Sequence, residues 1–532
     1  MNMTYEAQIE TESVDELKKI IDSFIKKEKE YLSEITIMKE QIRYLQDKLF
    51  GRKSEKISLG FQQISLFETA KDDFPIAEQA EEDEIEVPGH KRKKRGRKPI
   101  PENFPRIEVI HDVDEAEKQC ECGYQKKCIG QDISEQLDII PPKIKVIRNI
   151  RLKYACKKCE GLESNGPTVI IAPMPEQLIP KCIGTAGLIS FVLVAKFVDA
   201  LPFYRQEKQF LRIGIKISRA TMCSWAQKVA QSCDILLMML KKEILSGPLI
   251  NIDETPVQVL KEPKRTSQAK SYMWIFRGGI RQRSGILFEY HPTRAGDVAA
   301  VFLKGYKGIV QTDGYAGYGF IDRCKDILHM GCWAHVRRKF FDVVKAADKP
   351  KDGNRKPGNA DYALKYIRKL YRIEKEAKAK GLINGALFKE RQEKAKPVLD
   401  EFKRWLDSKF DKVPPKSLLG KAIAYTLNQW SRLVVYADTD YVTMDNNMAE
   451  NAIRPFVIGR KNWLFSGTPD GASASAAIYS LVETAKANGL EPYWYFRYLL
   501  EKLPKAITED DHNALLPQYL DKSQLEGPAN IS

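Results

Sequence analysis

The sequence predicts an α/β protein: a core with a mixed β-sheet and a helical insertion, preceded by a coiled coil, a cysteine-bearing module and a helical region. Three observations support this. Apolar residues recur at coiled-coil spacing near the N-terminus, cysteines cluster between residues 115 and 162, and short β-branched and aromatic segments begin at Pro248. A chain of 532 residues is also too long for a single hydrophobic core, so several domains are expected.

Residues 14–56 are predicted to form a coiled coil with a short flanking block. Apolar residues recur alternately four and three positions apart, which is the a/d spacing of a coiled coil, and only Glu28 interrupts them. The seam consists of Leu17, Ile21, Phe24, Glu28, Tyr31, Ile35, Met38, Ile42, Leu45 and Leu49. We expect self-association into a homo-oligomer; the alternative is an amphipathic helix folded onto its own chain.

Residues 57–114 are predicted to be a linker with a basic arm. An acidic stretch around residues 78–86 passes abruptly into the sequence HKRKKRGRKPIP, and the whole chain carries a net charge of +15. An extended Arg-Gly-Arg segment suits the narrow minor groove of double-stranded DNA, so we expect contacts from Arg95, Arg97 and Lys98 without sequence preference. The alternatives are a solvated charge run or plain phosphate contacts.

Residues 115–162 are predicted to be a zinc-finger module. Two thiol pairs, Cys120 with Cys122 and Cys156 with Cys159, supply the four ligands of a structural, tetrahedral Zn²⁺ site. The first pair has one intervening residue where two are usual, and Cys128 is close enough to substitute. The alternative is a set of incidental thiols.

Residues 176–245 are predicted to be helical. The segment Leu188–Phe197 is apolar, and two helices flank Gly214, the second opening at Ser218 as a helix-turn-helix recognition helix would. The apolar run is broken by Lys196 and is shorter than a bilayer requires, and the polar N-terminus differs from a signal peptide. We therefore expect a cytoplasmic, nucleoid-associated protein without a membrane partner.

Residues 248–344 are predicted to form the first part of the core. The expected elements are three strands, a helix and a fourth strand, at Leu249–Val259, Tyr272–Arg277, Gly285–Tyr290, Ala295–Leu303 and Gly308–Thr312. Three meandering strands followed by a helix and a further strand make a ribonuclease-H-like layout.

Two aspartates occupy positions in this layout that favour metal binding. Asp253 lies inside the first strand and Asp313 at the end of the fourth, and these strands are neighbours in the predicted topology. Carboxylates forced together repel, and a divalent cation relieves the repulsion. Their hard oxygen atoms suit Mg²⁺ or Mn²⁺. Either aspartate alone is equally typical of a surface or capping position.

A two-metal site for phosphoryl chemistry needs a third carboxylate. We assign it to Glu450, within the final core segment at residues 439–475, and Asp445 is the rival. Asn446 or Asn447 is expected to cap a short helix that Pro455 ends. Cationic residues beside this helix, suited to DNA phosphates, are Arg454, Arg460 and Lys461.

The long interval between Asp313 and Glu450 predicts a helical insertion at residues 345–438, and a further helical segment is expected at 476–510. The sequence GCWAHVRRKF before the insertion predicts a strand leading into a basic helix, with no catalytic residue. Its alternative is a second metal site, drawn from Cys324, His329, Cys332 and His335.

These motifs, in this order, resemble the insertion-sequence sixty-six family of transposases, specifically their large catalytic subunit. The resemblance runs from LFGRKSEK through KFVDALPFYRQE, DETP, TDGYAGY and GCWAHVRRKFFD to RKNWLFSG and the closing segment AAIYSLVETAKANGLEPYWYFRYLLEKLP. It implies a DDE-type transposase in which Asp253, Asp313 and Glu450 match the acidic triad, and it suggests accessory proteins from the same mobile element. Asn451 departs from the family's usual arginine, and the first zinc knuckle is narrower than usual.

The resemblance implies metal-dependent cleavage of one DNA strand at each element end, followed by attack of the freed 3′ hydroxyl on target DNA. The alternatives are an inactive DNA-binding regulator of the same fold, a simple nuclease, and a bridging protein built on the coiled coil.

Overall fold

The computed structural model describes residues 14–50, 144–155, 169–280, 283–347 and 357–525. The chain divides into two units, one of residues 1–76 with 178–520 and one of residues 77–177 with 521–532. The predicted basic arm and the five cysteines of the predicted zinc module lie outside the described residues.

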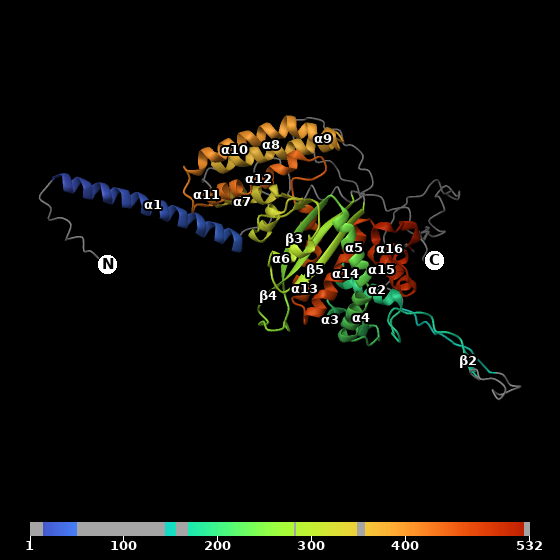
Figure 1. The fold of residues 1–532 in the computed structure, drawn as a ribbon. Coiled ribbons are helices and arrows are strands. Elements are labelled where there is room, and N and C mark those ends of the chain that lie inside the picture. Colours follow the sequence, from blue (N-terminus) through green and yellow to red (C-terminus); the bar gives the residue numbers. More distant parts are fainter. Residues whose placement is uncertain (1–13, 51–143, 156–168, 281–282, 348–356, 526–532) are drawn as a thin grey trace, which may run out of the picture. The chain divides into compact units, whose positions relative to one another are not determined.

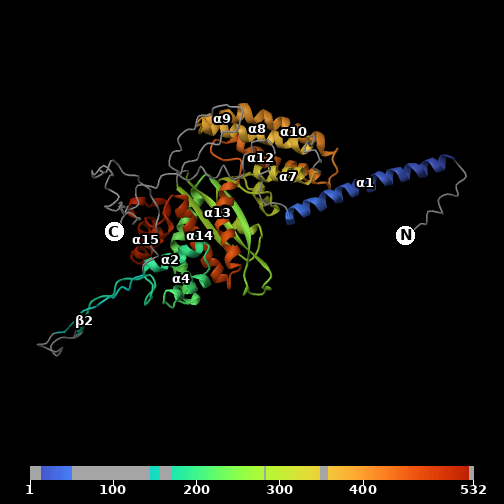
Figure 2. The ribbon, with the colours of Figure 1, turned by 180° about the vertical axis from the view of Figure 1, so that it is seen from behind.

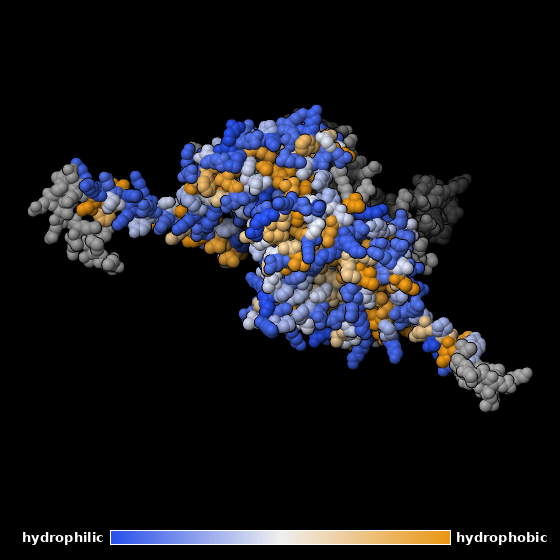
Figure 3. Space-filling model, in the orientation of Figure 1, coloured by the Kyte–Doolittle hydropathy of each residue, from blue (hydrophilic) through white to orange (hydrophobic). Residues whose placement is uncertain are grey.

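Helix α1 (Val14–Phe50) covers most of the predicted coiled coil as one continuous helix. Seam residues including Ile35, Ile42 and Leu49 are exposed, by 47%, 55% and 72%. Apolar side chains interrupt the hydrophilic surface of this helix in Figure 3. Several apolar side chains of the seam are therefore exposed, while the C-terminal part of the helix contacts α7, where the hydroxyl of Tyr44 donates to Asp342 at 3.3 Å.

A mixed five-stranded sheet forms the centre of the first unit. Its strands are β3 (Leu249–Gln258), β4 (Lys270–Ile280), β5 (Arg283–His291), β6 (Gly308–Gln311) and β7 (Ile327–Met330), in the order β5-β4-β3-β6-β7. β3, β4 and β5 form an antiparallel meander, while β6 pairs in parallel with β3 and β7. Helix α6 (Asp297–Phe302) precedes β6. Each strand and the helix lie where the residue pattern predicts them.

Helix α14 (Pro469–Ala487) covers the outer edge of the sheet along β5, and it lies beside the sheet in Figure 2. Ser480 and Thr484, one turn apart, accept the backbone N–H groups of Phe288 and Ile286 at 2.8 and 3.0 Å. The hydroxyl of Thr484 also contacts the carbonyl oxygen of Ile286 at 3.0 Å. Side chains of a helix thus satisfy the outward backbone groups of an edge strand, which would otherwise be open to pairing with another chain.

The predicted helices before the sheet are present. They are α2 (Ala186–Phe197), α3 (Phe203–Arg212), α4 (Arg219–Ser232) and α5 (Asp234–Ser246), and α2 packs against α15 (Pro492–Lys502). Between α3 and α4, Gly214 has a φ of 85°, a left-handed conformation that favours glycine. Ser218 accepts the N–H of Thr221 at 3.1 Å and so caps α4.

The helical segment that the sequence predicts as an insertion follows β7 and α7 (Trp333–Ala346). It comprises α8 (Asn359–Ala379), α9 (Gly385–Glu390), a π-helical turn (Arg391–Ala395), α10 (Lys396–Phe410), α11 (Leu418–Asn428), α12 (Trp430–Leu433) and a 3-10 turn (Val434–Asp438). The helices gather into one bundle (Figure 1). Its core is aromatic: the ring of Trp333 packs near those of Phe402, Trp430 and Tyr436.

Helix α13 (Asn447–Trp463) corrects one prediction, because it continues through Pro455 instead of ending there. A proline inside a helix removes one hydrogen bond and crowds the preceding turn. The following turns are held by tertiary packing. The Phe456 ring lies 5.3 Å from that of Tyr479 on α14 and 5.4 Å from that of Trp463. Burial of these rings outweighs the local preference of proline.

The described part of the second unit contains a small antiparallel pair, β1 (Lys153–Ala155) and β2 (Val169–Ile171). The guanidinium of Arg151 donates to the carbonyl of Ala172 at 2.6 Å beside this pair. In either unit, no helix of the described residues is long and apolar enough to cross a lipid bilayer.

Candidate active site

Two neighbouring strands place Asp253 and Asp313 on one side of the sheet. Asn251 of β3 and Gln311 of β6 are partners in the parallel register, and each aspartate follows two residues later. Because side chains along a strand alternate between faces, residues two apart share a face. Asp253 accepts the N–H of Glu254 at 2.8 Å, and Asp313 accepts the N–H of Tyr315 at 2.9 Å.

Glu450 reaches the same place from the first turn of α13. Burial raises the pKa of Asp253 well above its usual range, and the negative charges of Glu254, Glu450 and Asp313 raise it further. The charges of Asp313 and Glu450 therefore act on Asp253, although the three residues come from a strand interior, a segment just after a strand and a helix start far apart in the sequence. Among the described residues, their oxygen atoms do not form a group within 4.8 Å of one another.

Glu450 faces two basic residues of α7. Its Oε1 lies 3.8 Å from Nδ1 of His335, and its Oε2 lies 3.8 Å from a guanidinium nitrogen of Arg338. Both the Oε1 atom and the His335 Nδ1 atom are buried without a hydrogen-bond partner. Buried polar atoms without partners are uncommon and indicate that a water molecule or an ion belongs between them.

This donor set fits a divalent cation. Asp253, Asp313 and Glu450 offer hard oxygen ligands, and their mutual repulsion is the electrostatic situation that a doubly charged ion relieves. The unpartnered Oε1 of Glu450 shows that at least one of these oxygens is not already engaged within the described residues.

A buried amide network, which the sequence reasoning missed, lies directly behind the carboxylates. The side-chain amide of Asn251 donates to the side-chain oxygens of Gln311 at 2.7 Å and Asn446 at 3.0 Å. Asn446 in turn donates to the carbonyl of Ile252 at 2.8 Å, and Gln311 donates to the carbonyl of Thr443 at 3.0 Å. The network joins β3, β6 and the start of α13, the three segments that bear the acids.

Asn446 also corrects a prediction. It occupies the N-cap position of α13, but no side-chain capping bond forms there, because its amide is bonded to the strands instead. The signal for the network was present in the sequence: an amide residue precedes each aspartate by two positions and therefore shares its strand face.

We predict that Asn251→Leu will lower the free energy of unfolding by about 2–3 kcal/mol, because it leaves the buried oxygens of Gln311 and Asn446 without their donor. It should also weaken Mn²⁺ binding, since the strands and α13 are no longer held in register. Urea unfolding and Mn²⁺ titration measure the two effects. Asn462→Leu, at an exposed position of α13, is the matched control, and equal behaviour of both variants would contradict the role of the network.

Asp445, the rival third acid, is engaged elsewhere. It is buried and accepts the hydroxyl of Tyr371 on α8 at 2.6 Å and the amide of Asn447 at 3.3 Å. Burial raises its pKa to about 6. These contacts fasten the insertion to the start of α13 and favour Glu450 over Asp445 as the third acid.

The side chain of Glu254 lies on the opposite face of β3 from that of Asp253. It forms an ion pair with Arg294 and accepts the hydroxyl of Tyr318. The Arg294 guanidinium lies 3.8 Å from the centre of the Tyr315 ring, and the Tyr315 hydroxyl donates to the carbonyl of Arg294 at 2.9 Å. This cluster fixes the turn after Asp313, and nothing in the residue spacing indicated it.

A hydrogen bond places one of the predicted cationic residues, Arg460, beside the strand that bears Asp253. Arg460 on α13 donates to the hydroxyl of Thr255 on β3 at 3.1 Å, Lys461 is exposed, and Arg454 is half-buried. Arg338, in the helix that was predicted only to be basic, lies beside Glu450. Arg95, Arg97 and Lys98 of the basic arm lie outside the described residues.

His329 and Cys324, two members of the alternative metal set, have other partners. The His329 ring bridges Thr312 at 2.9 Å and Asp322 at 2.7 Å, and burial lowers its pKa to about 4. The thiol of Cys324 contacts the carbonyl of Phe320 at 3.5 Å. Cys332 and His335 instead lie close to Glu450.

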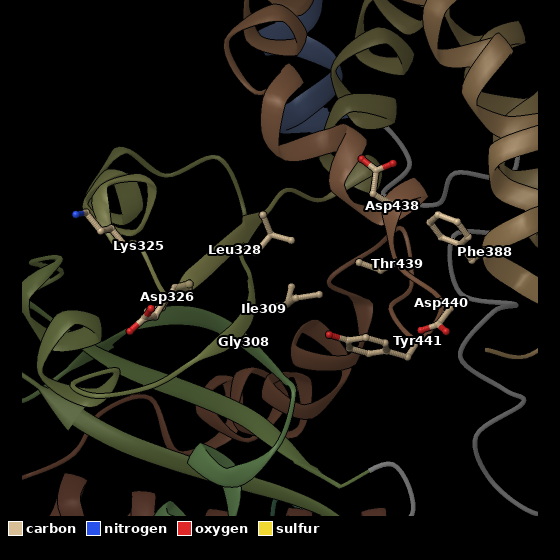
Figure 4. Close-up of a pocket in the computed structure, with 11 residues that line it drawn as sticks. Gly308, Ile309, Lys325, Asp326, Leu328, Phe388, Asp438, Thr439, Asp440 and Tyr441 are labelled. Carbon is tan, nitrogen blue, oxygen red and sulfur yellow. The ribbon is translucent and has the colours of Figure 1, made fainter. Parts of the chain in front are cut away.

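A cavity of about 540 Å³ lies away from the carboxylates, between the start of β6 and residues 438–441, which lead from the insertion toward α13. In Figure 4, Ile309 and Leu328 face Phe388 and Tyr441 across this space. Asp313 follows the opposite end of β6, and none of the three predicted carboxylates lines the cavity. We therefore place the candidate active site at the carboxylates and not in this cavity.

Comparison with known proteins finds one family along most of the chain. The family described as "Transposase IS66 family" matches residues 181–474. Related descriptions match the flanks: "Transposase C of IS166 homeodomain" at residues 37–109, "zinc-finger binding domain of transposase IS66" at 117–160 and "IS66 C-terminal element" at 480–518.

Two full-length relatives come from Sinorhizobium fredii (strain NBRC 101917 / NGR234). The uncharacterized protein y4jD is 30% identical over 502 residues, covering 90% of this chain and 93% of its own length. The uncharacterized protein y4qI is 29% identical over 498 residues, covering 90% of this chain and 87% of its own length. The resemblance seen in the motifs thus extends over nearly the whole chain.

Proposed function

Because the chain belongs to the IS66 transposase family, we propose that it is a DDE-type transposase that cuts DNA at the ends of a mobile element and joins the freed 3′ hydroxyl to target DNA. The observation that supports this most directly is that the negative charges of Asp313 and Glu450 act on the buried carboxyl group of Asp253. The family match supports a transposase role, and this interaction among three acids supports its chemistry.

The sheet supports a ribonuclease-H-like core. An antiparallel meander of β5, β4 and β3, continued by the parallel strands β6 and β7, agrees with the predicted layout. In this proposal residues 345–438 are an insertion into the core, and α13 supplies the third acid.

Asp253, Asp313 and Glu450 would hold Mg²⁺ or Mn²⁺, which when bound activates the attacking oxygen and stabilises the leaving one. The amide network of Asn251, Gln311 and Asn446 keeps the three carboxylates in register. Positive charge that suits DNA phosphates comes from four residues: Arg338, Arg454, Arg460 and Lys461. Because carboxylates and metal suffice for both steps, no covalent protein–DNA intermediate is proposed.

DNA recognition is assigned to segments before the core. The basic arm with Arg95, Arg97 and Lys98 would contact double-stranded DNA, and α3 with α4 would present a helical hairpin. The zinc-finger match supports structural Zn²⁺, which we assign to Cys120, Cys122, Cys156 and Cys159. Because its proposed substrate is DNA, we expect the protein to associate with the nucleoid. Accessory proteins of the same element are further proposed partners.

A strand-transfer assay tests the proposal. Purified protein, Mg²⁺ and a labelled duplex ending in the element's terminal sequence should yield nicked ends and then joined products in a target plasmid. Nicking without joining would support a simple nuclease. DNA binding with no metal-dependent cleavage would support an inactive regulator and overturn the proposal.

We further propose that α1 pairs protomers, so that two element ends are held together. Seven of its seam residues are large, apolar and exposed, and the spacing is that of a coiled coil: Ile21, Tyr31, Ile35, Met38, Ile42, Leu45 and Leu49. Large exposed apolar stripes are typical of interaction surfaces.

We predict that Ile35→Asp will shift the protein to a smaller oligomer, because it puts a charge at an a position in the middle of the seam. Light scattering after size-exclusion chromatography measures the mass. Ser33→Asp changes an exposed residue of the same helix outside the seam and should leave the mass unchanged. An unchanged mass for Ile35→Asp would show that α1 does not mediate assembly.

A further inference from the structure

Three potential metal-ligand atoms meet beside the candidate active site. The sulfur of Cys332, a ring nitrogen of His335 and a carboxylate oxygen of Glu450 all lie within 4.8 Å of one another. We propose that these three residues form a second metal site, for a borderline divalent ion such as Zn²⁺, which shares Glu450 with the proposed site for Mg²⁺ or Mn²⁺.

The fold builds this cluster from two helix starts. Cys332 is the N-cap residue of α7 and His335 lies in its first turn, so the Cys-x-x-His spacing points both side chains to the same side of the helix. Glu450 arrives from the first turn of α13. The two helices are joined here by a hydrogen bond from the N–H of Asn446 to the Cys332 sulfur, 3.2 Å long.

Two buried polar atoms of the cluster have no hydrogen-bond partner. Nδ1 of His335 and Oε1 of Glu450 face each other at 3.8 Å, and both atoms are buried without a hydrogen-bond partner. An ion between them would give each atom a partner, whereas direct contact does not. These two unsatisfied atoms support a bound ion independently of the proximity of the three ligand atoms.

The ligand chemistry selects the ion. One sulfur, one nitrogen and one oxygen are the donors that Zn²⁺ and Co²⁺ accept in tetrahedral sites, whereas Mg²⁺ requires oxygen. A metal ion binds the neutral imidazole of a histidine and the thiolate of a cysteine, so binding of the ion releases the Cys332 thiol proton to solvent. The N–H of Asn446 remains to stabilise the resulting thiolate.

Sharing of Glu450 has a regulatory consequence, which rests on the proposed function. If Glu450 is the third catalytic acid, an ion held by Cys332 and His335 competes for its carboxylate. Zn²⁺ would then inhibit cleavage that Mg²⁺ supports, and the protein would sense the balance of the two ions.

Metal content tests the site without reference to activity. The full-length protein is saturated with Zn²⁺, passed through a desalting column and analysed by mass spectrometry of the metal. Cys332→Ser and His335→Gln should each retain about one equivalent less than the wild type, because a tetrahedral site that loses one of three protein ligands binds weakly. Cys324→Ser changes a neighbouring thiol outside the cluster and should retain the wild-type amount.

Cobalt substitution provides a second readout. The Co²⁺ spectrum of wild type minus that of Cys332→Ser should contain a sulfur-to-metal charge-transfer band, and Cys324→Ser should leave the spectrum unchanged. Because His335 is partly exposed, His335→Gln serves if Cys332→Ser fails to fold. Equal zinc content in wild type and a folded His335→Gln variant would overturn the proposal.

The outcome separates this site from the proposed function. Asp253→Asn should keep the additional zinc equivalent, because Asp253 is not a member of the cluster. Loss of cleavage in Asp253→Asn with equal zinc content in all variants would refute the second site alone. The additional equivalent together with full cleavage by Asp253→Asn would refute the proposed function alone.

Discussion

Replacing Asp253 by asparagine is expected to reduce metal-dependent DNA cleavage by at least about a thousandfold, the scale seen when a central catalytic group is removed. Asparagine has nearly the same shape but no charge, so it cannot help to hold a divalent ion between β3, β6 and α13. Asp313→Asn and Glu450→Gln should have comparable effects. Release of a labelled strand from an element-end duplex measures the rate.

The same substitution should not unfold the protein. Burial and neighbouring negative charges raise the pKa of Asp253 above its value in the unfolded chain. A group whose pKa is raised on folding favours the folded state less as pH increases through the two pKa values, since it must then be charged in an unfavourable place. Without metal at neutral pH, Asp253→Asn should therefore melt at or above the temperature of the wild type.

Added Mn²⁺ gives the complementary measurement. It should raise the melting temperature of the wild type more than that of Asp253→Asn, because ligand binding to the folded state stabilises it in proportion to affinity. Asp470→Asn, at an exposed acid of α14, is the matched control and should cleave DNA and respond to Mn²⁺ as the wild type does. Normal cleavage by Asp253→Asn would contradict the assignment.

Local sequence signals predicted the elements that position the site. Alternating β-branched and aromatic residues placed β3, β4 and β5, and the parallel pairing of β3 with β6 explains why Asp253 and Asp313 end on one face. The pair of aspartates in this strand pattern was more specific than either alone, because a carboxylate inside an apolar strand is costly unless it has a partner. Glu450 was identified through its motif and the family resemblance, since spacing alone left Asp445 as a rival.

What the sequence did not predict depends on contacts between distant segments. Pro455 carries a strong local signal for a helix end, yet packing of Phe456 against α14 overrides it. Asn446 has the local signal of a cap, but a partner 195 residues away takes its side chain. The proximity of His335 to Glu450 could not be anticipated either, because only the fold brings α7 and α13 together.

Arg391 is the clearest example of such a contact. Its side chain is 1% exposed and lies in the π-helical turn before α10. It forms a two-point ion pair with Glu374 on α8, at 2.9 and 2.6 Å. Its remaining N–H groups donate to three backbone carbonyls of the segment that returns toward α13, those of Tyr436, Thr439 and Val442, at 2.8–2.9 Å. One guanidinium thus holds the insertion to the chain that leads into the third acid.

We predict that Arg391→Ala will destabilise the insertion by about 3–5 kcal/mol, because it leaves Glu374 without its cation and three carbonyls without donors. Arg391→Lys should recover only part of this loss, since an ammonium group cannot reproduce the planar fork that bonds a carboxylate and three carbonyls together. Urea unfolding followed by tryptophan fluorescence measures it, because Trp333, Trp405 and Trp430 all belong to the core of the insertion.

Lys403→Ala is the control for loss of a positive charge in the same bundle. Lys403 pairs with Asp407 at 2.7 Å within one exposed helix face, and such pairs contribute at most about 0.5 kcal/mol. If Arg391→Ala were no more destabilising than Lys403→Ala, the hydrogen bonds of Arg391 would not hold the segment that returns toward α13.

If these hydrogen bonds do hold that segment, Arg391→Ala should also slow cleavage at temperatures where the protein remains folded. The start of α13, and with it Glu450, would then lose one anchor to the insertion, while the bond between Tyr371 and Asp445 remains.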